Sequence, residues 1–120
     1  MKLLIAEDEQ TVLKILIFKM KKAGFEIDAA INGSQAQELF KMKMPKLVIT
    51  DINMPFVTGI ELITYIRIDC KSNVPILVLS GVTEEKLIIQ AFDLGANDFV
   101  SKPFRIRELI IRVKKLLDIY

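Results

Sequence analysis

The segment VITDINMPFVTG, residues 48–59, decides the fold because its pattern changes at one acidic residue. Up to Thr50 the chain is apolar and β-branched, as in a strand that is buried on both faces. Asp51, a Met-Pro pair and Gly59 follow, and a helical pattern resumes at Ile60. These residues predict a strand, a loop and a helix. Two interpretations of the acid stay open here: it is a turn residue, or it does chemistry at the strand tip.

The same succession of strand and helix extends along the whole chain. Short apolar segments predict strands at 2–7, 25–30, 46–51, 74–80 and 97–101. Helical periodicity follows at 12–20, 34–43, 60–68, 84–94 and 105–118, with Thr83 as an N-cap and Gly24 and Gly95 as stops. Strict alternation predicts a parallel sheet with right-handed crossovers and helices on both faces. We therefore expect one doubly wound α/β domain, (βα)5, over residues 1–120.

Composition excludes several classes of protein. Hydrophobic residues make up 52% of the 120, which predicts an ordered domain with its own core. No apolar run reaches the roughly 18–20 residues that span a bilayer. The first ten residues, MKLLIAEDEQ, meet acids too early for a secretory signal. The single Cys70 excludes an internal disulfide. We expect a cytoplasmic protein without a membrane partner.

The charged residues and the lack of histidine limit the reactions that this domain can carry out. The chain has 17 basic and 15 acidic residues, a balance that argues against direct nucleic-acid binding by this domain. It has no histidine, so histidine nucleophile pairs, general bases and metal sites are excluded. Any reaction here must use carboxylates, hydroxyls and lysines.

Polar residues follow the predicted strands at one edge of the sheet. Glu7 and Asp8 end the first strand, Asp51 the third, Ser80 the fourth and Lys102 the fifth. Ligands of open α/β sheets bind at this carboxyl edge. Clustered carboxylates need a counter-ion, and all-oxygen ligands suit Mg²⁺. With Lys102 opposite Asp51, the edge could hold a phosphoryl group.

Each of these residues also has an ordinary interpretation. Glu7 and Asp8 precede a helix and could favour its positive N-terminus. Asp51 and Ser80 could be turn residues, and Lys102 a surface lysine. Their common placement at one edge of adjacent strands favours a site.

The segments LLIAEDE, LVITDINMPFVTGIELI, PILVLSG and GANDFVSKPF resemble, in order and spacing, the motifs of response-regulator receiver domains of two-component signalling. The resemblance covers essentially the whole chain. It implies a fold like that of the chemotaxis receiver, with strand order 2-1-3-4-5, so that the tips of strands one and three are neighbours. It also implies a signalling domain that catalyses only its own phosphorylation and slow dephosphorylation, not an enzyme.

The resemblance implies a role for each matching acid. Asp51 would accept a phosphoryl group from a sensor histidine kinase or a phosphotransfer protein. Asp8 would bind Mg²⁺ directly, and Glu7 directly or through water. Asn53 would offer its backbone carbonyl to the same ion.

Further roles follow from the same resemblance. Lys102 would contact the phosphoryl oxygens, and the Lys102–Pro103 bond is a candidate for the cis form. Ser80 would hydrogen-bond the phosphoryl group, and Phe99, without the hydroxyl of the tyrosine found in many relatives, would move inward behind it. The apolar Val82 near the expected path of the hydrolytic water predicts slow dephosphorylation.

Receivers change the surface of their fourth helix, fifth strand and fifth helix when they signal, and here Ile88, Phe92 and Phe99 are the candidate partner residues. Ile88 and Phe92 are left near the surface if the rest of their helix faces the sheet; a packed core position is the alternative. The output would be a target protein or an attached domain.

The fifth helix, with Glu108 and Arg112 four residues apart, resembles receivers joined to winged-helix DNA-binding domains. That likeness favours a domain taken from a longer regulator and suggests a homodimer through the same surface. Ile88 and Asn97, where charges would help, argue against this dimer.

Three other functions fit the sequence less well than that of a phosphoacceptor. A Mg²⁺-dependent phosphatase is disfavoured because Asn53 replaces a second acid and no cap covers a substrate pocket. A flavin-binding module is disfavoured because the first loop, AEDEQT, is acidic. A receiver-like interaction module that needs no phosphorylation is the closest alternative.

Overall fold

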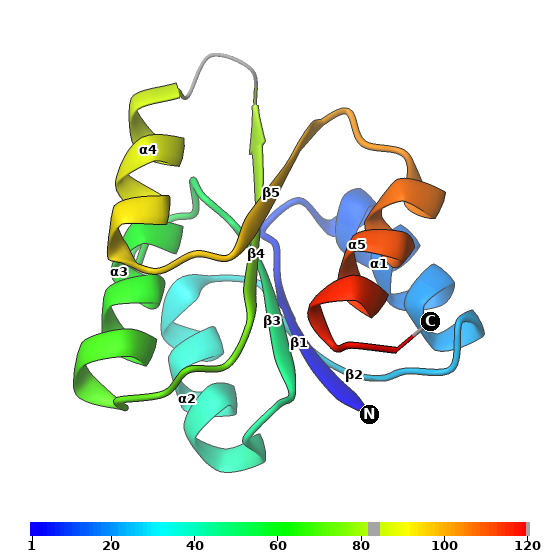
Figure 1. The fold of residues 1–120 in the computed structure, drawn as a ribbon, viewed down its shortest axis with the longest axis horizontal. Helices are drawn as coiled ribbons and strands as arrows, with labels where there is room; N and C mark the ends of the chain where they lie inside the picture. The colour runs from blue at the N-terminus through cyan, green and yellow to red at the C-terminus, as the bar shows by residue number, and fades with distance from the viewer. Residues whose placement is uncertain (82–84, 120) are drawn as a thin grey trace.

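A computed structural model describes residues 1–81 and 85–119 and contains one parallel sheet in the order β2-β1-β3-β4-β5 (Figure 1). The strands are β1 (Lys2–Ala6), β2 (Glu26–Ala30), β3 (Leu47–Asp51), β4 (Ile76–Gly81) and β5 (Asp98–Lys102). The helices are α1 (Gln10–Lys22), α2 (Gly33–Lys43), α3 (Gly59–Thr64), the π-helical η1 (Tyr65–Asp69), α4 (Glu85–Leu94) and α5 (Ile106–Leu116). The expected doubly wound (βα)5 fold and strand order are confirmed.

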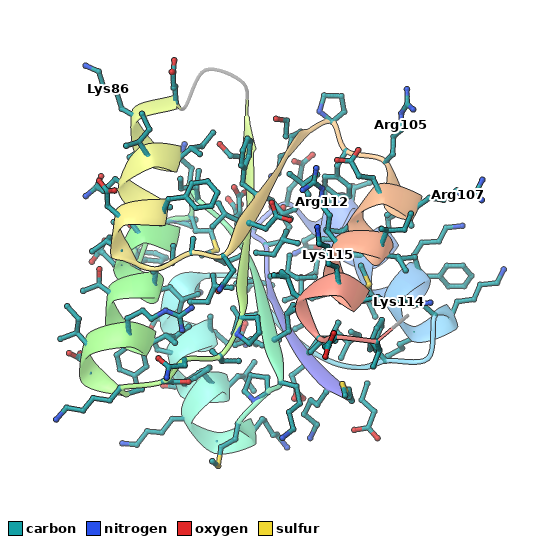
Figure 2. The ribbon with its side chains drawn as sticks, in the orientation of Figure 1. Lys86, Arg105, Arg107, Arg112, Lys114 and Lys115 are labelled. Carbon is teal, nitrogen blue, oxygen red and sulfur yellow. The ribbon has the colours of Figure 1, made fainter. Side chains whose placement is uncertain are left out.

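Helices cover both faces of the sheet, with α2, α3 and α4 on one side and α1 and α5 on the other (Figure 1). Alternate strand residues therefore enter different cores. Leu4 and Val48 pack on the first side, and Leu3 and Ile49 on the second. All residues of β3 are buried, which explains its unbroken apolar run. Figure 2 shows the side chains that fill the space between the layers.

The third helical segment departs from the expected single helix over 60–68. Thr58 and Glu61 form a capping box at the start of α3, and the chain widens into a π-helix after Thr64. This wider turn carries Arg67, whose Nη2 donates to the Gly95 carbonyl at 2.8 Å and to Asn97 Oδ1 at 3.0 Å. Arg67 thus ties η1 to the segment that enters β5.

Asn97 also has a structural role that the sequence did not indicate. Its Oδ1 accepts a hydrogen bond from the Ile76 N–H at 2.9 Å, and its own N–H donates to the Ile76 carbonyl at 2.8 Å. These bonds fix the amino ends of β4 and β5, at the edge of the sheet opposite the acidic residues. Asn97 is therefore occupied within its own chain.

Two expectations fall outside the described part of the chain: the N-cap at Thr83 and the effect of Val82. Within the described residues, no helix is long and apolar enough to cross a membrane.

Two glycines hold the loop after β3 close to the sheet. A Cβ on Gly59 would meet the Asp51 carbonyl oxygen and would lie 2.7 Å from the Ile52 Cα. A Cβ on Gly33, at the start of α2, would meet the backbone of Val57. The Gly59 N–H also donates to the Ile52 carbonyl at 3.0 Å. The tip of β3 is thus fixed by backbone contacts that leave no room for a side chain.

We predict that Gly59→Ala destabilises the protein by about 1–3 kcal/mol, because the added methyl forces the backbone at Asp51 and Ile52 to move. Without that clash the change would be slightly stabilising, since alanine favours a helix. Urea unfolding measures the difference, with Ser34→Ala on the exposed side of α2 as the control. A Gly59→Ala protein as stable as the control would contradict the steric argument.

Candidate functional site

Three carboxylates meet where β1 and β3 end. Glu7, Asp8 and Asp51 each offer an oxygen that lies within 4.8 Å of the other two. The strands are neighbours, with Ala6 opposite Thr50, so the acid after each of these residues reaches the same point. Glu7 is 0% exposed and Asp51 is 6% exposed, whereas Asp8 is open to solvent. The predicted cluster is therefore present, with two members buried.

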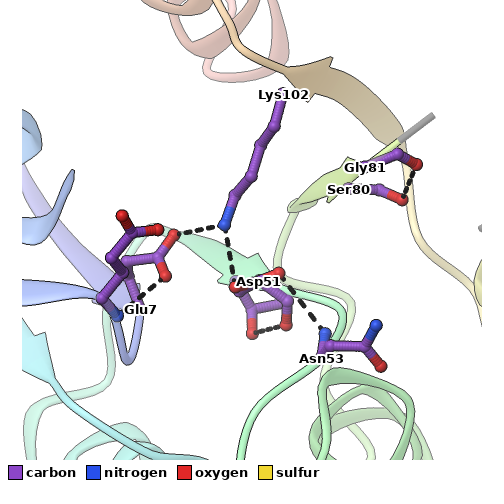
Figure 3. Close-up of polar contacts among 8 residues, drawn as sticks. Glu7, Asp51, Asn53, Ser80, Gly81 and Lys102 are labelled. Carbon is purple, nitrogen blue, oxygen red and sulfur yellow. Dashed lines mark hydrogen bonds and ion pairs between the residues drawn. The ribbon is translucent and has the colours of Figure 1, made fainter. Parts of the chain in front are cut away.

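Lys102 joins this cluster from the end of β5 (Figure 3). Its Nζ lies 2.9 Å from Asp51 Oδ2 and 2.9 Å from Glu7 Oε1. Because β4 lies between β3 and β5, the side chain must cross the tip of β4 to reach the acids. The Lys102–Pro103 peptide bond is cis. The sequence placed Lys102 opposite Asp51 but did not indicate its contact with Glu7.

Burial changes the acidity of these groups. Desolvation raises the pKa of Glu7 from 4.5 to about 7, and the nearby Asp51 charge adds to this. The Lys102 ammonium and the Glu9 N–H, which donates to Glu7 Oε2 at 3.1 Å, act in the opposite direction. Burial lowers the pKa of Lys102, but its hydrogen bond to Asp51 and its contact with Glu7 outweigh this, so the pKa is raised overall.

The donor set fits a hard divalent cation. Three carboxylates supply oxygen ligands of the kind that Mg²⁺ prefers. Glu7 Oε1 is buried against the Lys102 ammonium and accepts no hydrogen bond from the described residues, so it keeps unused acceptor capacity. One ammonium beside three acids leaves negative charge to neutralise. The residues present therefore fit the ion that the sequence implies.

Asn53 and Ser80 lie beside the cluster. The Asn53 N–H donates to Asp51 Oδ1 at 3.3 Å, so the two oxygens of Asp51 face different partners. Ser80 is buried on β4, and its hydroxyl donates to the Gly81 carbonyl at 3.0 Å (Figure 3). The metal contact expected for the Asn53 carbonyl and the phosphoryl contact expected for Ser80 remain predictions.

The predicted partner residues lie on α4 and β5. Phe92 and Phe99 pack edge to face, with ring centroids 5.9 Å apart and planes at 84°. Phe92 is 41% exposed, and Phe99 is half-buried against the core. Ile88 is half-buried, whereas its neighbour Ile89 is 55% exposed. The helix is therefore turned so that Ile89 shows more surface than the sequence indicated.

Comparison with known proteins agrees with this geometry. A family model described as the response regulator receiver domain matches residues 3–114. The chain belongs to the response-regulator receiver family. It is thus a signalling domain of two-component response regulators, and the resemblance inferred from the motifs is confirmed.

Solved receiver structures cover nearly all of the chain. The receiver domain of the Francisella response regulator 1452 is 30% identical over 98% of this chain and 96% of its own, with a TM-score of 0.90. The receiver domain of a Syntrophus aciditrophicus signal transduction histidine kinase is 27% identical over 98% and 89%, with a TM-score of 0.88. The Vibrio cholerae chemotaxis protein CheY4 is 25% identical over 96% and 97%, with a TM-score of 0.89.

One ion pair between β5 and α5 was missed by sequence reasoning. Arg112 Nη1 donates to both carboxylate oxygens of Asp98, at 2.9 and 3.0 Å, in addition to the expected pair with Glu108 at 3.2 Å. The spacing of Glu108 and Arg112 on one helix is visible in the sequence, whereas Asp98 comes from β5 and has no local signal.

We predict that stability in metal-free buffer falls by about 2 kcal/mol as the pH rises from 5 to 8, through the Glu7 carboxyl. The folded protein holds this proton up to a pKa of about 7, whereas the unfolded chain releases it near 4.5. The stabilisation is therefore full below pH 4.5 and lost as the pH passes 7.

Urea unfolding across that pH range tests this, with Glu7→Gln as the comparison because its amide carries no charge at any pH. The difference in free energy of unfolding between the two proteins should change with pH. Added Mg²⁺ should make this difference smaller at high pH. A pH-independent difference would show that Glu7 is ionised throughout.

Proposed function

We propose that Asp51 accepts a phosphoryl group in a Mg²⁺-dependent reaction, with a partner histidine kinase or phosphotransfer protein as the donor. The observation that carries the proposal is the Lys102 ammonium, held at 2.9 Å from both Asp51 and Glu7 at the tips of neighbouring strands. Membership of the receiver family supports it. In keeping with that family, we place the reaction in the cytoplasm.

The proposed transfer needs a positioned nucleophile more than a general base. A carboxylate oxygen of Asp51 attacks phosphorus while the phosphorus–nitrogen bond of the donor's phosphohistidine breaks. The electron pair of that bond returns to the imidazole, which takes up a proton, and an acyl phosphate forms on Asp51. Residues 1–120 contain no histidine, so the phosphohistidine of the donor lies outside this domain.

The surrounding residues orient Asp51 and balance charge. The Asn53 N–H and the Lys102 ammonium contact its two oxygens, so the carboxylate is fixed before the donor arrives. Lys102 then faces the negative oxygens of the incoming phosphoryl group. Glu7, Asp8, Asp51 and the Asn53 carbonyl would hold Mg²⁺. When bound, that ion neutralises charge on the phosphoryl oxygens.

Signalling would follow from changes on α4, β5 and α5. Ser80 would bind the phosphoryl group once formed, and Phe99 would leave its contact with Phe92 to move inward. Such a change would alter the surface offered to a target protein or an output domain. The domain would thus act as a phosphorylated switch and not as an enzyme on other substrates.

Incubation with acetyl phosphate and Mg²⁺ should add one phosphoryl group to the protein, detected by intact mass. Asp51→Asn is nearly isosteric and lacks the nucleophile, so it should gain none. Omission of Mg²⁺ should also abolish the gain. A phosphoryl group on Asp51→Asn would place the acceptor elsewhere. A folded natural protein that gains none even from a kinase would favour the phosphorylation-independent module.

We expect Lys102→Met to slow phosphorylation of Asp51 about 100-fold, because it removes the cation that faces the phosphoryl oxygens. The initial rate of mass gain measures the effect. Lys46→Met, an exposed lysine just before β3 at the opposite edge of the sheet, is the matched control. Equal rates for both variants would remove Lys102 from the proposed role.

A further inference from the structure

A groove of about 1010 Å³ runs between α5 and the start of β5. Asn97 and Asp98 line it on the strand side, and α5 supplies the opposite wall. A second hollow continues along β5 past Phe99 to Ser101 and shares Asp98 with the first. Among the described strands, β5 pairs only with β4, so its outer edge borders this space. The open edge of β5 and the two adjoining hollows suit an extended segment of another chain.

The groove carries unpaired positive charge. Four basic residues line it, whereas its two acids, Asp98 and Glu108, are both paired with Arg112. Arg105, Arg107 and Lys115 are exposed and have no ion-pair partner among the described residues. Figure 2 shows Arg105 and Arg107 projecting outward from the beginning of α5. A ligand would therefore meet three cations without ion-pair partners, around a centre where Arg112 offsets the charge of one of the two acids.

An exposed apolar side chain lies among these cations. Ile111, near the middle of α5, is 66% exposed and lines the groove together with Leu116. An exposed isoleucine gains free energy from an apolar partner and none from a phosphate backbone. The patch thus fits acidic protein better than nucleic acid.

We propose that this groove binds an acidic segment of a partner protein, whose carboxylates pair with Arg105, Arg107 and Lys115 and whose apolar side chain covers Ile111. A second copy of this chain fits poorly, because a two-fold contact would bring the same free cations together. Arg112, which could cross-link two copies, is already paired with Asp98 within one chain. The groove lies on the β5 and α5 part of the proposed output face, and the inference rests on the proposed function for this location.

The test uses the full chain without Mg²⁺ or phosphoryl donor, so that its failure is separate from failure of Asp51 phosphorylation. The probe is a synthetic peptide of Glu and Leu, titrated into isotope-labelled protein and followed by amide NMR. Shifts should concentrate at 97–98 and 105–116 and should be lost when the peptide's Leu are replaced by Ser. Shifts spread evenly over the lysines of α1 and α2 would overturn the proposal.

Matched charge reversals make the test specific. Arg105→Glu with Arg107→Glu should weaken binding of the peptide about tenfold, and Ile111→Ser about fivefold. Lys41→Glu with Lys43→Glu changes net charge equally at an exposed, remote part of α2 and should leave affinity within about twofold. Equal weakening by both charge reversals, or tighter binding of duplex DNA than of the peptide, would overturn the inference. Circular dichroism confirms that each variant is folded.

Discussion

The ion pair of Lys102 with Asp51 and Glu7 is the constraint on which the other features of the site depend. Two carboxylates taken out of water at neighbouring strand tips repel each other, and a buried charge is tolerated only when it is paired. Lys102 can serve both because β4 brings β5 within reach of β1 and β3. The strand order thus brings Lys102 within reach of both acids, and its ion pairs in turn hold the end of β5 beside the ends of β1 and β3. Burial raises the pKa of Glu7, and the contact with Lys102 offsets only part of this effect.

Backbone contacts and hydrogen bonds fix the strands that carry these charged side chains. The loop after β3 is held against the strand tip by Gly59 and against α2 by Gly33, where a side chain would collide with neighbouring backbone. At the far edge of the sheet, Arg67 and Asn97 fix the entry to β5. A strand anchored at its beginning and ionically held at its end has little freedom to shift.

The short strand β5 links the acidic site to the surface proposed for signalling. Lys102 ends the strand in the site, Phe99 lies against Phe92 of α4, and Asp98 binds Arg112 of α5. The five residues of β5 thus contact the acidic site, α4 and α5. Arg112 pairs with both acids of the α5 groove and leaves the outer cations of the groove without ion-pair partners among the described residues. The chemistry of the site and the charge of the surface therefore depend on one strand.

The sequence by itself determined the alternation of strands and helices, the placement of Glu7, Asp8, Asp51, Ser80 and Lys102 at one edge, and the family. Periodicity and turn residues are local, so they can be read without the fold, whereas the strand order came from the resemblance to receivers. The tertiary structure alone decided the π-helical turn, the reach of Arg67, the Asp98–Arg112 pair, the burial that raises the pKa of Glu7, and the greater exposure of Ile89 than of Ile88. These depend on how far a side chain reaches and how a helix rotates against its neighbours. Residues distant in the chain carry no local signal of such contacts.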